Sequence, residues 1–191
     1  AKFGVAQEMA NFNFTSTTTT CTITGVKNTV VTEIIVPNYV TSILQSSFKN
    51  CSSLESITVP FVGGTLNGTE NTHFGYIFGA SSYSENKTYV PTSLEEVVIT
   101  GGSIASYAFY YCNSLTDIIV STENTSYKSI DGNLYAKDGT TLIQYTCGKT
   151  ATKFTIPNSV TSIGDRAFYN CTSLTSVEIP DSVTSIDQDA F

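Results

Sequence analysis

One five-position motif recurs along this chain and constrains its fold more than any other feature. The pattern Phe-x-x-Cys-x-x-Leu-x-x-(Val/Ile)-x-(Ile/Val) occurs at residues 48–59, 109–120 and 168–179. The dipeptide Ile156-Pro157 likewise recurs as Ile179-Pro180, 23 residues later. A unit this short cannot cover its own apolar side chains, whereas stacked units can cover one another. The sequence therefore predicts a repeat solenoid.

Six rungs of the solenoid can be placed by their short strands. Each strand ends in an apolar-x-apolar pattern, which turns the apolar pair inward and the residue between them outward. The predicted fold is a right-handed stack with one short parallel β-strand per rung of about 23 residues, mostly strand and loop with short helical or 3₁₀ turns. The rungs are expected to begin at Val31, Leu54, Leu94, Leu115, Ala151 and Leu174.

The whole chain, residues 1–191, is expected to form a single domain. Residues 61–93 are rich in Gly, Asn and aromatic residues, which predicts a long ordered loop rather than a helix. In residues 121–150, Asp131-Gly132 and Asp138-Gly139 predict a β-hairpin insertion. Because the pattern stops within a repeat, we expect the chain to be part of a longer array. The remaining segments are a β cap (1–30), the first rungs (31–60), the middle rungs (94–120) and the C-terminal rungs (151–191).

Composition excludes several classes of function. The chain has 9 Lys and Arg against 16 Asp and Glu, a net charge of −7, which disfavours nucleic acid and anionic membrane surfaces as partners. It has no apolar run near the roughly 20 residues that span a bilayer, so no membrane insertion is expected. A single histidine, His73, and the lack of any catalytic motif predict a protein that is not an enzyme, with no cofactor and no metal.

The five cysteines are Cys21, Cys51, Cys112, Cys147 and Cys171. An odd number argues against a complete disulfide framework. Cys51, Cys112 and Cys171 share one repeat position and lie two rungs apart, beyond the roughly 7 Å span of a disulfide. We therefore expect buried free thiols, with a Cys112–Cys147 bridge between adjacent rungs as the alternative.

The tail Ile-Pro-x-x-Val-Thr-Ser-Ile-x-x-x-(Ala/Ser)-Phe-x-x-Cys-x-x-Leu resembles the BspA-like leucine-rich repeats of bacterial and protist surface proteins. The resemblance covers nearly the whole chain. It departs at Pro91 and Gly148, which stand where the repeat has Cys, and at Ala151, which replaces the strand Leu. The resemblance implies a secreted or cell-surface binding module, in accord with the low charge and the abundance of Ser and Thr. The first residues lack a signal-peptide pattern.

The outward strand positions form the first candidate site. A row of exposed side chains on the concave face of a solenoid suits an extended partner, and Val98 with Ile119 would form an apolar patch. The alternative is that β-branched residues suit strands anywhere. The expected contact residues are Ile35, Thr58, Glu96, Val98, Asp117, Ile119, Lys153 and Glu178.

The aromatic insertion forms the second candidate site. Tyr76, Phe78, Tyr83 and Tyr89 would stack on a glycan, or they would close a local core over the third rung. The leading functional prediction is a monomeric adhesion module that binds an extracellular protein or glycan through the strand row. The alternatives are a structural spacer that presents another domain and a glycan-binding module that uses this insertion.

Overall fold

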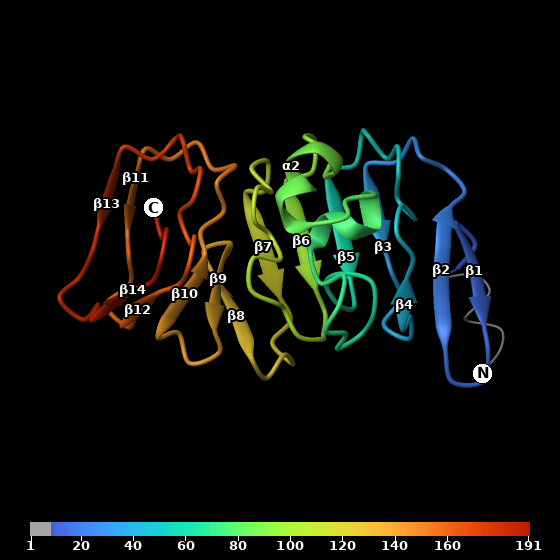
Figure 1. Cartoon of the computed structure of the whole chain (residues 1–191), viewed down its shortest axis with the longest axis horizontal. Coiled ribbons are helices and arrows are strands. Elements are labelled where there is room, and N and C mark those ends of the chain that lie inside the picture. The colour runs from blue at the N-terminus through green and yellow to red at the C-terminus, as the bar shows by residue number, and fades with distance from the viewer. Residues whose placement is uncertain (1–8) are drawn as a thin grey trace.

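All six predicted strands are present in the computed structural model, which describes residues 9–191 and leaves residues 1–8 of the predicted cap outside the description. Each strand begins two residues after the predicted start of its rung, and Leu54, Leu94 and Leu115 at that start are buried ahead of their strands. The rungs follow one another along the longest axis of the molecule (Figure 1). The strands are β3 (Glu33–Ile35), β5 (Ser56–Val59), β6 (Glu96–Ile99), β7 (Asp117–Val120), β11 (Lys153–Thr155) and β13 (Ser176–Glu178).

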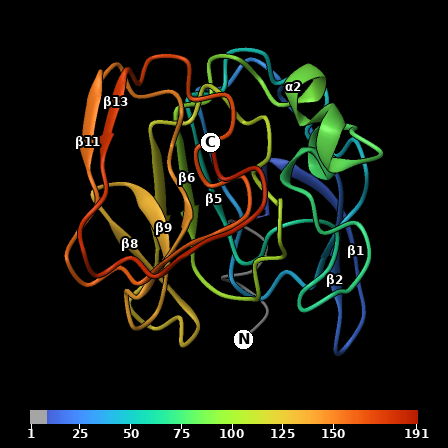
Figure 2. The ribbon, with the colours of Figure 1, turned by 60° about the vertical axis from the view of Figure 1, so that its left-hand side comes forward.

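These strands do not form one continuous sheet. They pair in parallel as a four-stranded sheet, β3-β5-β6-β7, and a separate two-stranded sheet, β11-β13. The break follows from the second insertion, whose residues reach the free edge of β7. The Ile118 amide donates to the Gly132 carbonyl at 2.8 Å, and the Val120 amide donates to Ser129 Oγ at 2.7 Å. The turned view separates β11 and β13 from the larger sheet (Figure 2).

The second insertion forms the predicted hairpins. Three antiparallel strands follow one another: β8 (Tyr127–Ile130), β9 (Asn133–Ala136) and β10 (Thr141–Gln144). These strands do not simply project from the solenoid, because β10 pairs in parallel with β12 (Ser162–Ile163) and β12 with β14 (Ser185–Ile186). The Val-Thr-Ser-Ile segment of the repeat thus makes a second short strand in its rung, as it also does in β4 (Ser42–Ile43).

The N-terminal cap is a β-hairpin. Strands β1 (Phe12–Ser16) and β2 (Cys21–Val26) pair antiparallel, as the alternating pattern of this segment predicts. Strand β2 also pairs in parallel with β4, so the hairpin covers the edge of the first rung.

The first insertion contains helical turns, so the prediction of a loop without helix was wrong. Two 3₁₀ helices, η1 (Phe74–Phe78) and η2 (Tyr83–Glu85), are followed by the single-turn helix α2 (Asn86–Tyr89). The third rung has no Phe at the position where the repeat motif begins. Phe74 and Phe78 of the insertion face inward and take the place of that ring. The rings form a continuous column through Phe48, Phe78, Phe74 and Phe109, with centroids 5.2–6.2 Å apart.

The cysteine prediction was partly wrong. Cys147 and Cys171 form a disulfide with their Cα atoms 4.4 Å apart, and Cys112 is free. The prediction of free thiols is therefore wrong for Cys147 and Cys171, and the alternative of a Cys112–Cys147 bridge is wrong as well, because the partner of Cys147 lies on the rung after it. Cys21, Cys51 and Cys112 are buried free thiols, as predicted, and burial raises the pKa of each.

The buried side chains fall into two core clusters that meet at the hairpin insertion. One cluster runs from Met9 to Leu134, and the other from Tyr135 to Ala190. Leu134 and Tyr135 are consecutive residues of β9, so their side chains point to opposite faces of the strand. Strand β9 therefore divides the interior into an N-terminal core and a C-terminal core.

Candidate functional site

The predicted row of outward side chains is present on the four-stranded sheet. Strand register places Ile35 beside Thr58, Thr58 beside Val98, and Val98 beside Ile119. The alternate residues of these strands are buried in the N-terminal core, so the row faces away from it. Ile35 is 57% exposed and Ile119 is 38% exposed, with Thr58 and Val98 half-buried between them.

Acidic side chains run beside this apolar row. The register places Glu96 beside Asp117, and Glu33 lies two strands away in the same line. Glu55 and Glu95 are exposed just before β5 and β6, and the Glu95 amide donates to the Glu55 carbonyl at 2.9 Å. The sheet thus presents an apolar line bordered by negative charge.

Lys153 and Glu178 do not belong to this surface. They lie on β11 and β13, in the separate two-stranded sheet beyond the hairpin insertion. Glu178 Oε2 accepts a hydrogen bond from Thr155 Oγ1 at 3.0 Å. Six of the eight predicted contact residues therefore lie on the four-stranded sheet, and Lys153 and Glu178 lie on the two-stranded sheet.

The aromatic insertion does not present its four predicted residues together. Phe78 is 2% exposed and packs between Phe48 and Phe74, so it cannot stack on a glycan and its assignment was wrong. Tyr76 is half-buried and meets His73 edge-on, with the ring centroids 5.8 Å apart. Tyr83 and Tyr89 are exposed.

Tyr83 instead joins a tyrosine cluster that the sequence analysis did not find. Its ring centroid lies 5.5 Å from that of Tyr107 and 5.8 Å from that of Tyr110. The Tyr110 ring lies 5.0 Å from that of Tyr169, which comes from a rung further along the stack. We call Tyr83, Tyr107, Tyr110, Tyr111 and Tyr169 the tyrosine cluster.

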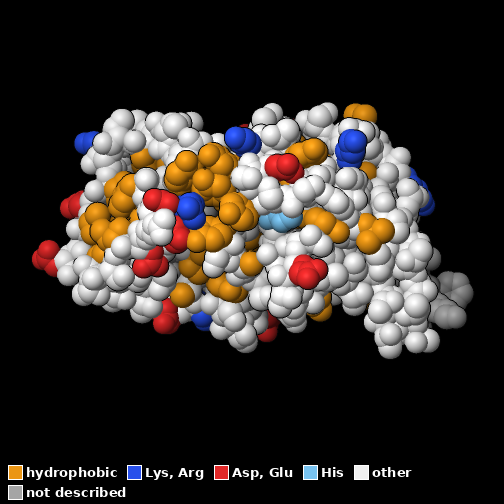
Figure 3. Space-filling model, in the orientation of Figure 1, with side chains coloured by type: hydrophobic (Ala, Val, Ile, Leu, Met, Phe, Trp, Pro, Cys, Tyr) orange, Lys and Arg blue, Asp and Glu red, His pale blue; other side chains and the backbone are white. Residues whose placement is uncertain are grey.

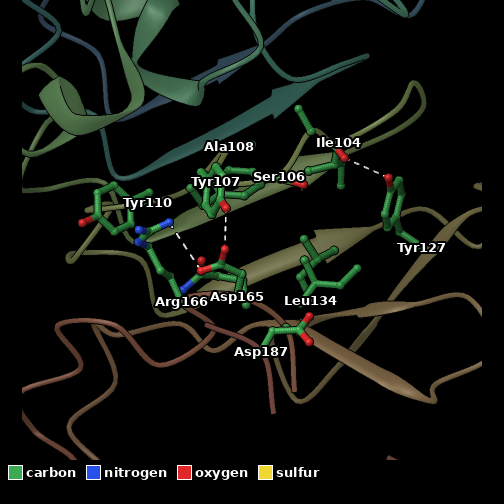
Figure 4. Close-up of a pocket in the computed structure, with 15 residues that line it drawn as sticks. Ile104, Ser106, Tyr107, Ala108, Tyr110, Tyr127, Leu134, Asp165, Arg166 and Asp187 are labelled. Carbon is green, nitrogen blue, oxygen red and sulfur yellow. Dashed lines mark hydrogen bonds and ion pairs between the residues drawn. The ribbon is translucent and has the colours of Figure 1, made fainter. Parts of the chain in front are cut away.

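A pocket of about 240 Å³ opens beside the tyrosine cluster, between the turn at residues 104–110 and the turn at residues 164–166. Ile104, Leu134 and Ile143 supply its apolar lining, and Tyr107 and Tyr110 form part of its wall. Figure 3 shows hydrophobic side chains around a hollow on this face, with side chains of both charges beside it. Figure 4 shows the labelled side chains around the pocket.

The polar side of the pocket is a network around Asp165 and Arg166. Tyr107 Oη donates to Asp165 Oδ2, which raises the pKa of the tyrosine (Figure 4). Arg166 Nη2 lies 2.9 Å from Asp189 Oδ2, and the guanidinium lies over the Tyr107 and Tyr110 rings, 4.9 and 5.5 Å from their centroids. Asp165 Oδ1 is buried, lies 3.4 Å from Arg166 Nη1 and has no hydrogen-bond partner among residues 9–191.

The pocket lies beside the fifth rung, whose turn is shortened. From the β12 residue Ile163 to Cys171 the chain takes eight residues, but from the paired residue Leu142 to Cys147 it takes only five. The short turn leaves a gap that lets Tyr110 and Tyr169 meet across it. This length difference is one sequence signal for the pocket. The other is Cys147, which stands one residue before the Cys position of the repeat, where this rung has Gly148.

In residues 9–191 no helix is both long and apolar enough to cross a membrane. Within the same residues no three His, Cys, Asp or Glu side chains converge as metal ligands would. The buried His73 instead has its Nε2 3.0 Å from the Ala80 carbonyl oxygen.

Two solved structures resemble the fold over most of this chain. A leucine-rich repeat protein from Eubacterium ventriosum has a TM-score of 0.52 and 22% identity, covering 91% of this chain and 58% of that one. The pneumococcal vaccine antigen PcpA has a TM-score of 0.51 and 20% identity, covering 84% of this chain and 38% of that one. The chain therefore spans less than two thirds of the length of either structure.

The family comparison is more specific. No protein of curated function matches the sequence significantly. The model of the BspA type leucine rich repeat region matches in six copies, over residues 2–77, 82–148 and 140–191. Together with the six strands at the repeat positions, this match shows that the chain belongs to the BspA-type leucine-rich repeat family.

Proposed function

We propose that this chain is a non-catalytic binding module of a secreted or cell-surface protein, and that it contacts a partner protein through the β3-β5-β6-β7 sheet. The observation that carries the proposal is the line of Ile35, Thr58, Val98 and Ile119, held in register on four hydrogen-bonded strands. Rigid strands present such a surface without the entropy cost of ordering loops on binding.

The chemistry of the sheet favours one kind of partner. Glu33, Glu96 and Asp117 border the apolar line, and the whole chain carries a net charge of −7. A partner surface with an apolar centre and flanking Lys or Arg side chains would complement both features. The expected partner is thus a basic region of an extracellular protein.

Two observations support a location outside the cell. Members of this family are typically cell-surface proteins. The Cys147–Cys171 disulfide suits an oxidising compartment, because cytosolic thiols are kept reduced.

The test is solid-phase binding to a panel of extracellular proteins. The Val98→Lys/Ile119→Lys variant places two positive charges in the centre of the apolar line. We expect it to lose at least about tenfold in affinity, as truncation of central interface residues does. The melting temperature should change little, because both side chains point away from the core.

The matched control is Thr155→Lys/Ser176→Lys, which adds the same two charges to exposed positions of the two-stranded sheet. It should bind like the unmodified chain. Equal loss in both variants would show a nonspecific charge effect and contradict the assignment. A chain that binds no protein on the panel would favour a structural spacer instead.

A further inference from the structure

We propose that the pocket between the tyrosine cluster and Arg166 is a second binding site, and that it takes one sugar ring of a neutral oligosaccharide. The site is separate from the sheet proposed above. It lies where β9 divides the two cores, and small-molecule sites favour such junctions between packed units.

The size of the pocket limits the ligand. At about 240 Å³ it is smaller than the roughly 300–1,000 Å³ of pockets that hold drug-sized molecules. It is therefore suited to one ring, with the rest of a chain running outward over the tyrosine cluster. Tyr83 and Tyr169, which pack against Tyr110, would offer ring faces for further sugar units along that path.

The charges around the pocket exclude charged ligands. Asp165 and Asp187 both line it, and together they would repel a phosphate, a sulfate or a carboxylate. A cationic ligand would lie close to the guanidinium of Arg166, which also lines the pocket and would repel it. A neutral ligand would be repelled neither by the two carboxylates nor by the guanidinium.

The remaining groups match the chemistry of a sugar. A pyranose presents an apolar C–H face, which would pack on the apolar lining of Ile104, Leu134 and Ile143, and hydroxyls, which both donate and accept hydrogen bonds. Asp165 Oδ1 is a buried oxygen that is ion-paired with Arg166 but accepts no hydrogen bond in the described part of the chain, so a ligand hydroxyl that reached it would supply the missing hydrogen bond. Arg166 supplies donors a short distance away, because its Nη1 lies 3.4 Å from that same oxygen.

The repeat geometry holds these groups in place. Tyr107 and Arg166 occupy the same position of their turns, two residues before Phe109 and Phe168, and both have a left-handed backbone with φ of 63° and 55°. Such residues persist only where the surrounding structure fixes them. The pocket wall is therefore preorganised, which lowers the entropy cost of binding.

The experiment is an array of neutral hexose and N-acetylhexosamine oligosaccharides, printed beside sialylated and sulfated versions. The intact chain should bind at least one neutral oligosaccharide and show no preference for the acidic versions. Asp165→Asn, which keeps the size of the side chain but removes its charge, should weaken that binding about tenfold or more. Tyr110→Ala should weaken it similarly.

Tyr89→Ala is the matched control, because Tyr89 is an exposed tyrosine of the first insertion and does not line the pocket. It should bind like the unmodified chain, as should Val98→Lys/Ile119→Lys. Loss of binding in Tyr89→Ala with retention in Asp165→Asn would move the site to the insertion and overturn the proposal. Binding of acidic glycans alone, or of none, would also overturn it.

A measurement on the unmodified chain covers the case in which a variant does not fold. Saturation-transfer NMR with irradiation of the aromatic protons should transfer signal to the C–H protons of one sugar ring of the bound oligosaccharide. Equal transfer to all rings of the oligosaccharide, or no transfer, would contradict insertion of one ring into the pocket.

Discussion

The inner rungs and the last rung of this sequence are built from the same motif but differ in how completely their side chains are buried. Leu54, Leu94 and Leu115 are at most 1% exposed in the N-terminal core. The equivalent Leu174 is half-buried, as is Val177 of β13, because both lie on the last rung of this sequence and no following rung in residues 9–191 covers them. The repeat sequence therefore sets which side chains point inward, and the neighbouring rungs set how far those side chains are buried.

The two regions also use their repeat cysteine differently. In the N-terminal core Cys51 and Cys112 are buried thiols, since Pro91 occupies the cysteine position of the rung between them. In the C-terminal core Cys147 and Cys171 lie on adjacent rungs and are bonded.

The largest expected effect comes from truncating the repeat leucine in each region. Leu115→Ala should lower the free energy of unfolding by roughly 3–5 kcal/mol, because it leaves a cavity in a closed core. Leu174→Ala should cost less than about 2 kcal/mol, because part of that side chain is already in contact with water. Urea unfolding of both variants measures the difference, and equal losses would contradict the unequal burial of the two regions.

The next effect comes from reducing the disulfide. The sequence separation of Cys147 and Cys171 is 24 residues, and opening a loop of this size should lower the stability by about 3 kcal/mol. Thermal unfolding with and without a reductant measures this change. The Cys147→Ser/Cys171→Ser variant should not respond to the reductant. If it responded as strongly as the intact chain, the effect would have to come from the other cysteines.

The smallest effect concerns Tyr135 of the C-terminal core. Its hydroxyl is buried with no hydrogen-bond partner among residues 9–191, and burial raises its pKa to about 12. Tyr135→Phe should therefore stabilise the chain by up to about 1 kcal/mol at neutral pH, because it removes an unsatisfied polar group.

The same substitution should change the response to alkaline pH. The folded chain keeps the Tyr135 proton between pH 10 and about 12, whereas the unfolded chain releases it, so stability falls as pH rises through this range. Tyr135→Phe should show a smaller fall in urea-unfolding experiments between pH 9 and pH 11. Parallel curves for the two proteins would show that Tyr135 does not contribute.

The sequence predicted the features that depend on local spacing. The strand starts follow from the position of the repeat Leu, and the hairpins of residues 121–150 follow from Asp131-Gly132 and Asp138-Gly139. The features that depend on contacts between distant rungs were not predicted. The Cys147–Cys171 bond and the meeting of Tyr110 with Tyr169 both require knowing that the fifth turn is three residues shorter.

The first insertion was misjudged for a related reason. Its Gly and Asn residues are typical of a loop, but Phe74 and Phe78 are drawn into the aromatic column that the third rung cannot complete by itself. Asn86 then fixes α2 to the fourth rung, with its Nδ2 donating to the carbonyls of Ala108 and Tyr110. Tertiary contacts, which the local pattern does not contain, decide the structure of this segment.

Amide hydrogen exchange tests most directly whether the N-terminal core makes the β3-β5-β6-β7 sheet a rigid binding surface. The amides of β5 and β6 have a hydrogen-bonded strand on both sides, whereas β11 and β13 pair only with each other. We predict that β5 and β6 exchange at least about tenfold more slowly than β11 and β13, reflecting a higher opening free energy. Equal exchange in the two sheets, or faster exchange in β5 and β6, would contradict the account.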